Sequence, residues 1–413
     1  MKLLTWNING LRSNLTNLNL TAFLDDCEAD IICFQETKLT RSELTSELAC
    51  PPNYDAFYSF SKLKKGYSGV ATFVRTNSIQ TLAADTTQCI YNEGRLIITE
   101  HDHFVLMNTY CPAHGGNLER KMIYHEYLSS QIANCRDKYK HKPIVLVGDL
   151  NVIHKPIDDC GDFEAYEATA WLDDVLGEND MAMVDAFRHF HPNDTKAYTC
   201  WRTLTGARET NYGVRIDYIL LDKRLLSDTL DVHLWVEKQG SDHCPVVAQF
   251  TFDKSNGAPT TVLSCAKYYP EFAGIQTSMQ VYLDTSAPPV QPTTILKKRT
   301  TSTWQQQSFK SFLTTASSKR SKVDNSSPPP PASTESQSIQ QLSEYQTVAK
   351  SWKQLLPGKA PPPPLCSGHK EPSLQRTVLK RNDNYGRKFY ICAKPEGAKG
   401  DPKARCNFFQ WAN

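Results

Sequence analysis

The sequence predicts a layered α/β domain, followed by a proline-rich linker and a small C-terminal module. Short apolar runs bounded by polar or glycine turns indicate strands, and runs with apolar residues at three-to-four spacing indicate helices between them. The composition changes near residue 252, because 14 of the 24 prolines lie between residues 253 and 365. We therefore divide the chain into a domain at 1–252, a disordered linker at 253–360 and a module at 361–413.

The predicted elements of the domain alternate along the chain. Strand-like runs occupy residues 2–8, 31–34, 69–75, 96–100, 104–110, 143–148, 214–221 and 245–250. Helical spacing occurs at residues 16–27, 117–138 and 164–176. This alternation favours helices layered on a mixed sheet.

The balance of charge differs between the two ends of the chain. The whole sequence has 46 basic and 44 acidic residues, a net charge of +2. Residues 351–413 hold 12 Lys or Arg and 4 Asp or Glu, a net of +8, which leaves 34 basic and 40 acidic residues, a net of −6, in the other 350. A compact basic module is typical of proteins that bind a polyanion such as nucleic acid.

Two observations bear on the compartment in which the protein works. The sequence has no run of 18 apolar residues and no signal-peptide pattern at its N-terminus, so we expect neither a membrane-spanning nor a secreted protein. The 13 cysteines then fit reduced thiols better than disulfides. We expect a soluble intracellular protein without a membrane partner.

Polar residues lie within or beside the strand-like runs at five places, where burying them without a role would cost free energy. The five are Asn7 with Asn9, Glu36, Asp149 with Asn151, Asp217, and Asp242 with His243. Each alone is an ordinary turn or helix-cap residue. Together they predict a functional site, because loops at one end of the strands gather in layered α/β folds.

The residue types in this set favour phosphodiester hydrolysis. Glu36, Asp242 and Asn9 offer the hard oxygen ligands that Mg²⁺ prefers. Such an ion polarises a phosphoryl oxygen, while a carboxylate or imidazole deprotonates the attacking water. We expect Asp217 to hold His243 in its charged form beside the phosphate.

Seven motifs are spread in order along the first 250 residues. They are Trp6-Asn7-Ile8-Asn9-Gly10-Leu11-Arg12, Gln35-Glu36-Thr37-Lys38, Gly66-Tyr67-Ser68-Gly69-Val70, Glu93-Gly94-Arg95, Gly148-Asp149-Leu150-Asn151, Arg215-Ile216-Asp217-Tyr218 and Ser241-Asp242-His243. In this order they resemble the exonuclease III-type AP endonucleases. The resemblance implies a four-layered α/β sandwich with two packed sheets, the endonuclease/exonuclease/phosphatase fold, and a metal-dependent hydrolase of phosphodiesters.

The resemblance also implies a role for each matching residue. Ligands of Mg²⁺ or Mn²⁺ are Glu36, Asp242, Asn9, Asp149 and Asn151. Catalytic residues are Asn7, Tyr110, Asp149, Asn151, Asp217 and His243. Tyr110 and His243 contact the scissile phosphate, and whether Asp149 or His243 is the base is left open. Tyr67 and Trp201 are implied DNA contacts.

Three positions depart from the family pattern. Asn9 stands where an Asp is usual, which removes a negative charge from the metal site. Cys200 and Val214 stand where the abasic-site pocket has aromatic residues. A less aromatic wall predicts weak incision at internal abasic sites and favours strand ends. Residues 154–160 and 211–213 also resemble a eukaryotic branch of the family whose dominant activities are 3′-5′ exonuclease and 3′-phosphodiesterase.

The linker contains a short motif that predicts a protein partner. The spacing of Gln306, Phe309, Phe312 and Leu313 places three apolar side chains on one side of a 3₁₀ turn. This spacing resembles the motif with which proteins bind the sliding clamp PCNA. Basic runs at 297–299 and 319–322 are candidate nuclear localisation signals.

The last 48 residues contain the spacing of a structural zinc site. Cys366, His369, Cys392 and Cys406 form the pattern Cys-x₂-His-x₂₂-Cys-x₁₃-Cys, a closed tetrahedral ligand set for Zn²⁺. Buried free cysteines are the alternative, but a module this small needs a staple to fold. The sequence Gly386-Arg387-Lys388-Phe389 resembles the core of a GRF zinc finger.

Basic and aromatic residues alternate around these zinc candidates, as single-stranded nucleic acid binding requires. Arg387, Lys388 and Arg405 are the predicted DNA contacts. The chain as a whole is thus predicted to be a monomeric, nuclear, Mg²⁺-dependent nuclease of base excision repair, with a mitochondrial fraction left open. Its expected substrates are DNA with abasic sites or with blocked or mismatched 3′ ends.

Two other functions are compatible with parts of the sequence. A phosphatase or phosphodiesterase of the same superfamily, acting on lipids or inositol phosphates, shares the Asn, Glu, Asp-x-Asn and Asp-His elements. A largely non-catalytic DNA-damage scaffold is suggested by Asn9 and by the less aromatic pocket wall.

Overall fold

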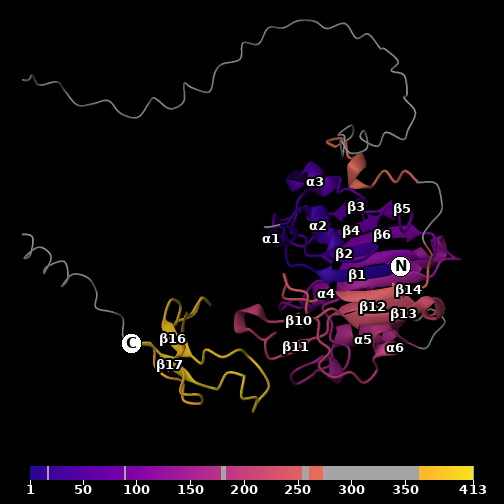
Figure 1. Cartoon of the computed structure of the whole chain (residues 1–413). Helices are drawn as coiled ribbons and strands as arrows, with labels where there is room; N and C mark the ends of the chain where they lie inside the picture. The colour runs from indigo at the N-terminus through magenta and orange to yellow at the C-terminus, as the bar shows by residue number, and fades with distance from the viewer. Residues whose placement is uncertain (16–17, 88–89, 178–182, 254–259, 273–361, 413) are drawn as a thin grey trace, which may run out of the picture. The chain divides into compact units, whose positions relative to one another are not determined.

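The computed structural model describes residues 1–15, 18–87, 90–177, 183–253, 260–272 and 362–412. In residues 1–272, two six-stranded sheets pack face to face (Figure 1). The first sheet has the strand order β13 (Thr229–Leu234), β14 (Val246–Phe250), β1 (Lys2–Asn7), β2 (Ile31–Gln35), β4 (Val70–Arg75) and β3 (Tyr54–Ser59). The second sheet has the order β5 (Thr81–Asp85), β6 (Leu96–His101), β7 (Val105–Tyr110), β8 (Ile144–Asp149), β12 (Asp217–Asp222) and β9 (Met183–Asp185).

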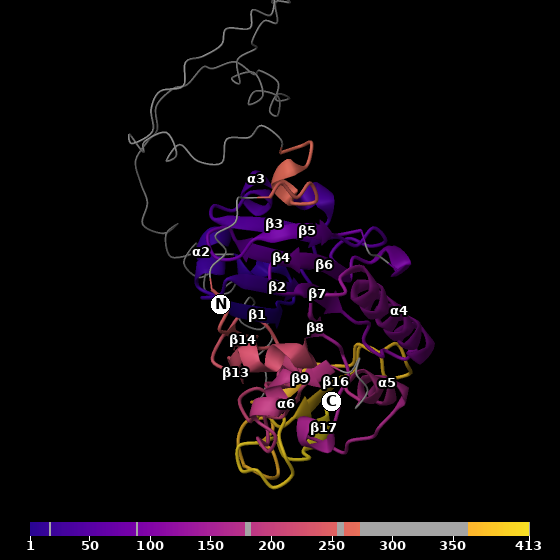
Figure 2. The ribbon, with the colours of Figure 1, turned by 90° about the vertical axis from the view of Figure 1, so that its right-hand side faces the viewer.

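Helices cover the outer face of each sheet. The first sheet carries α1 (Leu11–Asn14), α2 (Leu20–Asp25) and α3 (Ser46–Ala49), and the second carries α4 (Leu118–Lys138) and α5 (Glu167–Val175) (Figure 2). A further short helix, α6 (Ala186–Phe190), joins the core between the sheets. The predicted four-layered α/β sandwich is therefore confirmed. Among the described residues, no helix has the length and apolar character needed to cross a lipid bilayer.

Three hydrophobic cores separate the four layers. Leu3 of β1 and Val147 of β8 belong to the core between the sheets. Leu4 and Trp6 of β1 point the other way and pack with Phe23 of α2. Both faces of β1 are buried, which explains why its sequence is a nearly continuous apolar run instead of an alternating one.

A polar bridge crosses the core between the sheets. Gln35 Nε2 donates to Asn108 Oδ1 at 2.8 Å and to Thr5 Oγ1 at 2.9 Å. Asn108 Nδ2 donates to the Ala71 carbonyl at 2.9 Å and to Thr72 Oγ1 at 3.1 Å. Because a buried amide without partners costs free energy, this bridge favours one alignment of the two sheets.

The short helices α3 and α6 were not predicted, and one expected helix differs in extent. Within the helix expected at 16–27, the structure has the shorter α2, which begins after Asn19, and α1 lies before the expected start. The Asn19 side chain accepts a hydrogen bond from the Ala22 amide at 2.8 Å, a typical N-cap. The helices expected at 117–138 and 164–176 are observed as α4 and α5.

The strands differ more. The run at 214–221 forms two strands, β11 (Gly213–Val214), which pairs with β10 (Cys200–Trp201), and β12. Among the strands of the first domain, the sequence did not predict β3, β5, β9, β10 or β13. The edge strand β13 shows the reason, since only some of its side chains are buried and it lacks a continuous apolar run.

The first domain includes residues beyond the expected boundary at 252. Ala266, Tyr269 and Phe272 are buried in the core on the outer face of the first sheet. The Arg41 guanidinium lies 3.9 Å from the centre of the Tyr269 ring and donates to Glu271 at 2.8 Å. Residues 254–259 and 273–360 of the expected linker lie outside the described residues.

The C-terminal module, residues 362–412, is built on three antiparallel strands. They are β15 (Leu374–Thr377), β16 (Lys388–Ile391) and β17 (Phe409–Trp411), with β16 in the middle. The rings of Phe389 and Phe409 stack at 5.3 Å, and Trp411 meets Phe409 edge-on at 5.2 Å. These rings are only partly buried, and Phe409 is exposed, so the module has little apolar core for an independent fold.

Candidate active site and zinc site

The candidate residues of the first domain meet where parallel strands end. β1 and β2 are parallel in the first sheet, and β7 and β8 are parallel in the second. Asn7 lies opposite Gln35, and Tyr110 lies opposite Asp149. The loops that follow these strands therefore start side by side, as in other layered α/β sites.

The backbone is constrained on both sides of Asp149. A Cβ built on Gly148, whose φ is 132°, would lie 1.9 Å from the Thr109 carbonyl oxygen, so only glycine fits between β7 and β8. After the strand ends, Glu36 (φ 50°) and Asn151 (φ 54°) adopt the left-handed conformation. This conformation costs about 1–3 kcal/mol at a non-glycine residue and is concentrated at functional sites.

Asn7 connects the two sheets at the site. Its Nδ2 donates to Asp149 Oδ2 at 2.9 Å and to Glu36 Oε1 at 3.1 Å. Tyr110 donates its hydroxyl proton to the same Glu36 oxygen at 2.7 Å. Asn151 donates from its backbone to Asp149 Oδ1 at 2.8 Å and from Nδ2 to Asp149 Oδ2 at 3.2 Å.

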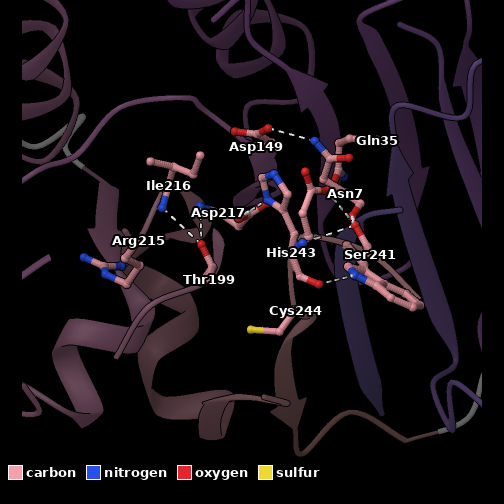
Figure 3. Close-up of polar contacts among 12 residues, drawn as sticks. Asn7, Gln35, Asp149, Thr199, Arg215, Ile216, Asp217, Ser241, His243 and Cys244 are labelled. Atoms are coloured by element: carbon pink, nitrogen blue, oxygen red, sulfur yellow. Dashed lines mark hydrogen bonds and ion pairs between the residues drawn. The ribbon is translucent and has the colours of Figure 1, made fainter. Parts of the chain in front are cut away.

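His243 lies between Asp217 and Asp149, as Figure 3 shows. Its Nδ1 is 2.8 Å from Asp217 Oδ2, and side-chain oxygen and nitrogen atoms of the three residues lie within 4.8 Å of one another. Thr199 holds the Asp217 backbone, because its hydroxyl oxygen accepts the Asp217 amide at 3.2 Å. The side chains of all three acid–base residues are buried.

The pKa values of Asp149 and His243 are both raised by their surroundings. Burial, and next the charge of Asp217, raise the pKa of Asp149 to about 7. Burial alone would lower the pKa of His243, but Asp217 outweighs it, so this pKa is raised well above 6.5. The imidazole is therefore protonated at neutral pH, whereas Asp149 exchanges a proton near neutral pH, a separation typical of acid–base sites.

Glu36 remains a carboxylate despite its partial burial. Burial raises its pKa, but the hydrogen bonds from Asn7 and Tyr110 and the charge of Lys38 outweigh that effect and lower it. Burial, followed by the charges of Glu36 and Asp149, raises the pKa of Tyr110 well above 10. The phenol thus stays a hydrogen-bond donor.

Asp242 and Asn9 lie beside Glu36 on the solvent side. Asn9 Nδ2 donates to Asp242 Oδ1 at 2.9 Å. Lys38 Nζ lies 3.1 Å from Glu36 Oε2 and also donates to Asn9 Oδ1. Because carboxylate and amide oxygens already converge on one ammonium group, this donor set fits a hard divalent cation such as Mg²⁺ or Mn²⁺.

Tyr67 connects to the site through a buried arginine. Arg95 Nη2 donates to the Tyr67 hydroxyl at 2.9 Å. The same guanidinium lies 4.6 Å from the centre of the Tyr110 ring and 2.6 Å from Glu93 Oε2. Tyr67 itself is half-buried and partly accessible to a ligand.

The predicted pocket wall lies on the short β10–β11 pair. Cys200 and Val214 face each other there, and both are half-buried. Trp201 is buried, with Nε1 donating to Asn211 Oδ1 at 3.0 Å. A pocket of about 460 Å³ adjoins Asp242; its lining residues are Trp201, Thr203, Gly206, Arg208, Glu209, Gln239, Ser241 and Asp242.

The four zinc candidates come together in the C-terminal module. The ligand atoms of Cys366, His369, Cys392 and Cys406 lie within 4.8 Å of one another. His369 Nδ1 is 3.7 Å from Cys366 Sγ and 3.4 Å from Cys392 Sγ. A tetrahedral zinc site has ligand atoms about 3.5–3.8 Å apart, so this geometry fits Zn²⁺. A backbone hydrogen bond from Glu371 lowers the pKa of Cys366 to about 6, which favours the thiolate that zinc binds.

The predicted DNA contacts of this module have different surroundings. Arg387 lies 4.0 Å from the centre of the Trp411 ring, and Lys388 is exposed at the start of β16. Arg405 is exposed but donates to Glu396 at 2.7 Å. The clamp motif, Gln306, Phe309, Phe312 and Leu313, lies outside the described residues, as do both basic runs.

Some residues around the site were not given a role from the sequence. Lys38, Arg95 and Thr199 each contact a candidate residue directly. Lys38 and Arg95 each belong to one of the seven motifs, close in sequence to Glu36 and Glu93. This proximity could have predicted that they lie at the site. Thr199 had none, because a threonine before a short strand is an ordinary residue.

The comparisons with known proteins agree over the whole chain. The profile of the Endonuclease/Exonuclease/phosphatase family matches residues 4–243, and that of the GRF zinc finger matches residues 364–413. The chain is 33% identical to the Xenopus laevis DNA-(apurinic or apyrimidinic site) endonuclease 2 over 514 aligned residues, which cover 100% of this chain and 98% of the relative.

A bacterial relative and a solved structure cover the first domain. The Bacillus subtilis exodeoxyribonuclease is 35% identical over 254 residues, 60% of this chain and 98% of the relative. The crystal structure of the Xenopus laevis APE2 catalytic domain superposes with a TM-score of 0.59 at 34% identity, covering 67% of this chain and 100% of that one. The chain therefore belongs to the endonuclease/exonuclease/phosphatase family and carries a GRF zinc finger at its C-terminal end.

Proposed function

We propose that the protein is a metal-dependent DNA repair nuclease that removes nucleotides and blocking groups from 3′ ends. The names of its relatives, an apurinic or apyrimidinic site endonuclease and an exodeoxyribonuclease, support DNA as the substrate. The observation that carries the proposal is the contact of Asn7 with both Glu36 and Asp149. Asn7 thereby links the carboxylate proposed to bind a cation to the carboxylate proposed to accept a proton from water.

In this mechanism, each residue acts through the contact described above. Glu36, Asp242 and Asn9 would hold a divalent cation, which would supply charge neutralisation at the scissile phosphate. Asp149 accepts the proton of the attacking water, since its pKa of about 7 matches the working pH. His243 is protonated and bonded to Asp217, so it donates to a phosphate oxygen and does not act as the base.

The remaining residues position these groups. Asn7 and Asn151 donate to the Asp149 carboxylate and orient its free lone pairs. Tyr110 donates its hydroxyl proton to Glu36, and this phenol would serve as the donor to the scissile phosphate. Asp149, which Asn7 links to Glu36, and Asn151 would add oxygen ligands for a cation.

We propose that strand ends are preferred over internal abasic sites. Cys200 and Val214 add no aromatic ring beside Trp201, so this wall offers a smaller stacking surface to an extruded sugar or base. The expected order of activity is 3′-5′ exonuclease and 3′-phosphodiesterase above abasic-site incision. Tyr67 and Trp201 are the proposed DNA contacts of this domain.

The C-terminal module is proposed to hold single-stranded DNA with zinc as its structural ion. Arg387 is exposed next to the Trp411 ring, and Lys388 is exposed at the start of β16. Basic side chains beside an aromatic ring suit phosphate binding together with base stacking. Arg405 joins them once its contact with Glu396 is exchanged for phosphate. We also propose that the enzyme is a monomer, that it works in the nucleus, and that the PCNA clamp recruits it through residues 306–313.

A single assay tests the catalytic assignment. Purified protein with Mg²⁺ is given a 5′-labelled duplex with a recessed 3′ end, and Asp149→Asn is expected to abolish shortening of the labelled strand. Asp137→Asn, an exposed aspartate of α4, is the matched control and should retain activity. Equal activity of Asp149→Asn and the wild type would refute the assignment, whereas a wild type without activity would support the scaffold alternative. Parallel substrates with an internal abasic site, a 3′-phosphoglycolate or a mismatched 3′ end rank the preferences.

A further inference from the structure

A lysine lies fully buried behind the site. Lys121, on the second turn of α4, has no exposed surface, although lysine is among the residues least often buried. It was not part of any motif in the sequence. Burying an ammonium group is costly unless hydrogen bonds replace its hydration, so its surroundings indicate what the position requires.

The Lys121 ammonium has three backbone acceptors. Its Nζ donates to the carbonyl oxygens of Pro112 at 3.0 Å, Leu150 at 3.3 Å and Asn151 at 2.9 Å. An ammonium group carries three N–H donors, so every donor has a partner. The residue is therefore satisfied without a carboxylate in hydrogen-bond contact, and its partners all belong to loops of the site.

These three carbonyls come from two different loops. Pro112 follows Tyr110, the last residue of β7, and Leu150 and Asn151 follow Asp149, the last residue of β8. Those strands are parallel neighbours whose last residues lie opposite each other. One ammonium group thus fastens the two loops together directly after the residues proposed to contact phosphate and water.

The same turn carries the left-handed residue of the site. With φ at 54°, Asn151 turns its carbonyl oxygen back to Lys121 while its side chain donates to the Cys111 carbonyl at 3.0 Å and to Asp149 Oδ2 at 3.2 Å. This conformation is unfavourable by itself, and the hydrogen bond to Lys121 offsets part of its cost. Loss of that bond would remove one of the contacts that hold the Asn151 turn beside Asp149.

We propose that Lys121 is a positioning residue for the nuclease reaction, holding the turn after Asp149 so that the carboxylate keeps its orientation toward the attacking water. The inference rests on the proposed function, because it assigns the proton transfer to Asp149. Lys121 does not touch substrate, so its loss acts on the rate of the chemical step more than on DNA binding.

The test compares lysine variants in the full-length protein. Lys121→Met keeps the length of the side chain and removes the donors, and Lys121→Gln keeps two of them. Lys142→Met is the matched control, because Lys142 also binds a backbone carbonyl, that of His101 at 2.8 Å, but lies away from the site. The assay measures kcat and KM on the recessed 3′ end, with the folded fraction measured by circular dichroism.

The expected result is a kcat about 100-fold lower in Lys121→Met with KM within about threefold, as a misplacement of about 1 Å produces. Lys121→Gln should lie between Lys121→Met and the wild type, and Lys142→Met should keep kcat within about threefold. If Lys121→Met does not fold, Lys121→Gln carries the same comparison.

Three results would overturn the positioning role. They are a folded Lys121 variant with unchanged kcat, a change in KM alone, and an equal loss of kcat in Lys142→Met. Failure of the proposed function has a different signature, because Asp149→Asn would then retain activity whatever the Lys121 variants do.

Discussion

Asp149 and Asp217 lie directly opposite each other in the antiparallel register of β8 and β12, and each is 1% exposed. Two ionised carboxylates at this separation repel each other strongly in a buried environment. His243, hydrogen-bonded to Asp217, neutralises one of them. The other, Asp149, therefore ionises reluctantly, which makes it a better proton acceptor than an exposed aspartate.

Replacing Asp149 should stabilise the fold at neutral pH. The folded-state pKa of about 7 lies above the unfolded value of about 3.9, so the protonated form favours folding and this contribution is lost as pH rises from about 4 to about 7. Asparagine has no such loss. We expect Asp149→Asn to raise Tm at about pH 8 by a few degrees and to leave it unchanged at about pH 4.

Thermal unfolding followed by circular dichroism measures both values. Asp137→Asn again serves as the control, because this exposed aspartate has little effect on folding. A shift of the same size at both pH values would show that Asp149 ionisation does not oppose folding.

Asp217→Asn should change the pH profile of the enzyme. Without the Asp217 charge, burial lowers the pKa of His243, so the imidazole loses its proton within the working pH range. Activity should then fall more at about pH 8.5 than at about pH 6, because the charged imidazole is needed to contact the phosphate. The measurement is kcat/KM against pH on the recessed 3′ end.

The control for this profile is Asp222→Asn at the other end of β12, where the carboxylate pairs with Arg224. Its profile should run parallel to that of the wild type. A loss in Asp217→Asn that is equal at every pH would mean that Asp217 acts through shape and not through charge.

An added aromatic ring should shift substrate preference. Val214 faces Cys200 across the β10–β11 pair and is half-buried. Val214→Trp supplies a flat surface for an extruded abasic sugar, a contact worth about 1 kcal/mol or several-fold in rate. We expect the ratio of abasic-site incision to 3′-end cleavage to rise, and Val214→Leu to leave that ratio unchanged. An unaltered ratio in Val214→Trp would remove the pocket wall from the specificity argument.

Removal of zinc should weaken binding to single-stranded DNA without abolishing hydrolysis. We expect one zinc ion per chain by elemental analysis and its loss in Cys392→Ser, because three ligands hold a structural ion poorly. Affinity for single-stranded DNA, measured by fluorescence anisotropy, should fall and show a weaker salt dependence. Cleavage of a short recessed duplex should remain. Unchanged affinity in the zinc-free variant would place the DNA contacts elsewhere.

The sequence was sufficient for the layers and for the residue types of the site. β1, β2 and β8 are apolar runs that end in Asn7, Gln35 and Asp149, and this pattern identifies both the strand and its functional end. The two parallel pairs, buried on both faces, give the strongest signal that a strand can have.

Contacts between residues of different sheets could not be predicted from the sequence in the same way. The contact of Asn7 with Asp149 joins residues 142 positions apart, and it depends on how two sheets pack. Lys121 was missed for a different reason, since a lysine near the start of a helix normally faces solvent. Short edge strands such as β13 were missed because exposed side chains break their apolar pattern.

The Gln35–Asn108 bridge holds the two sheets together, and the active site needs both sheets. Enzymatic activity therefore shows whether the sheets remain associated. Each half of the catalytic machinery belongs to a different sheet, with Glu36 on one and Asp149 on the other. A partly unfolded state that retained both sheets but separated them would keep its far-ultraviolet spectrum and lose all turnover. Loss of activity should therefore precede loss of secondary structure during gentle denaturation.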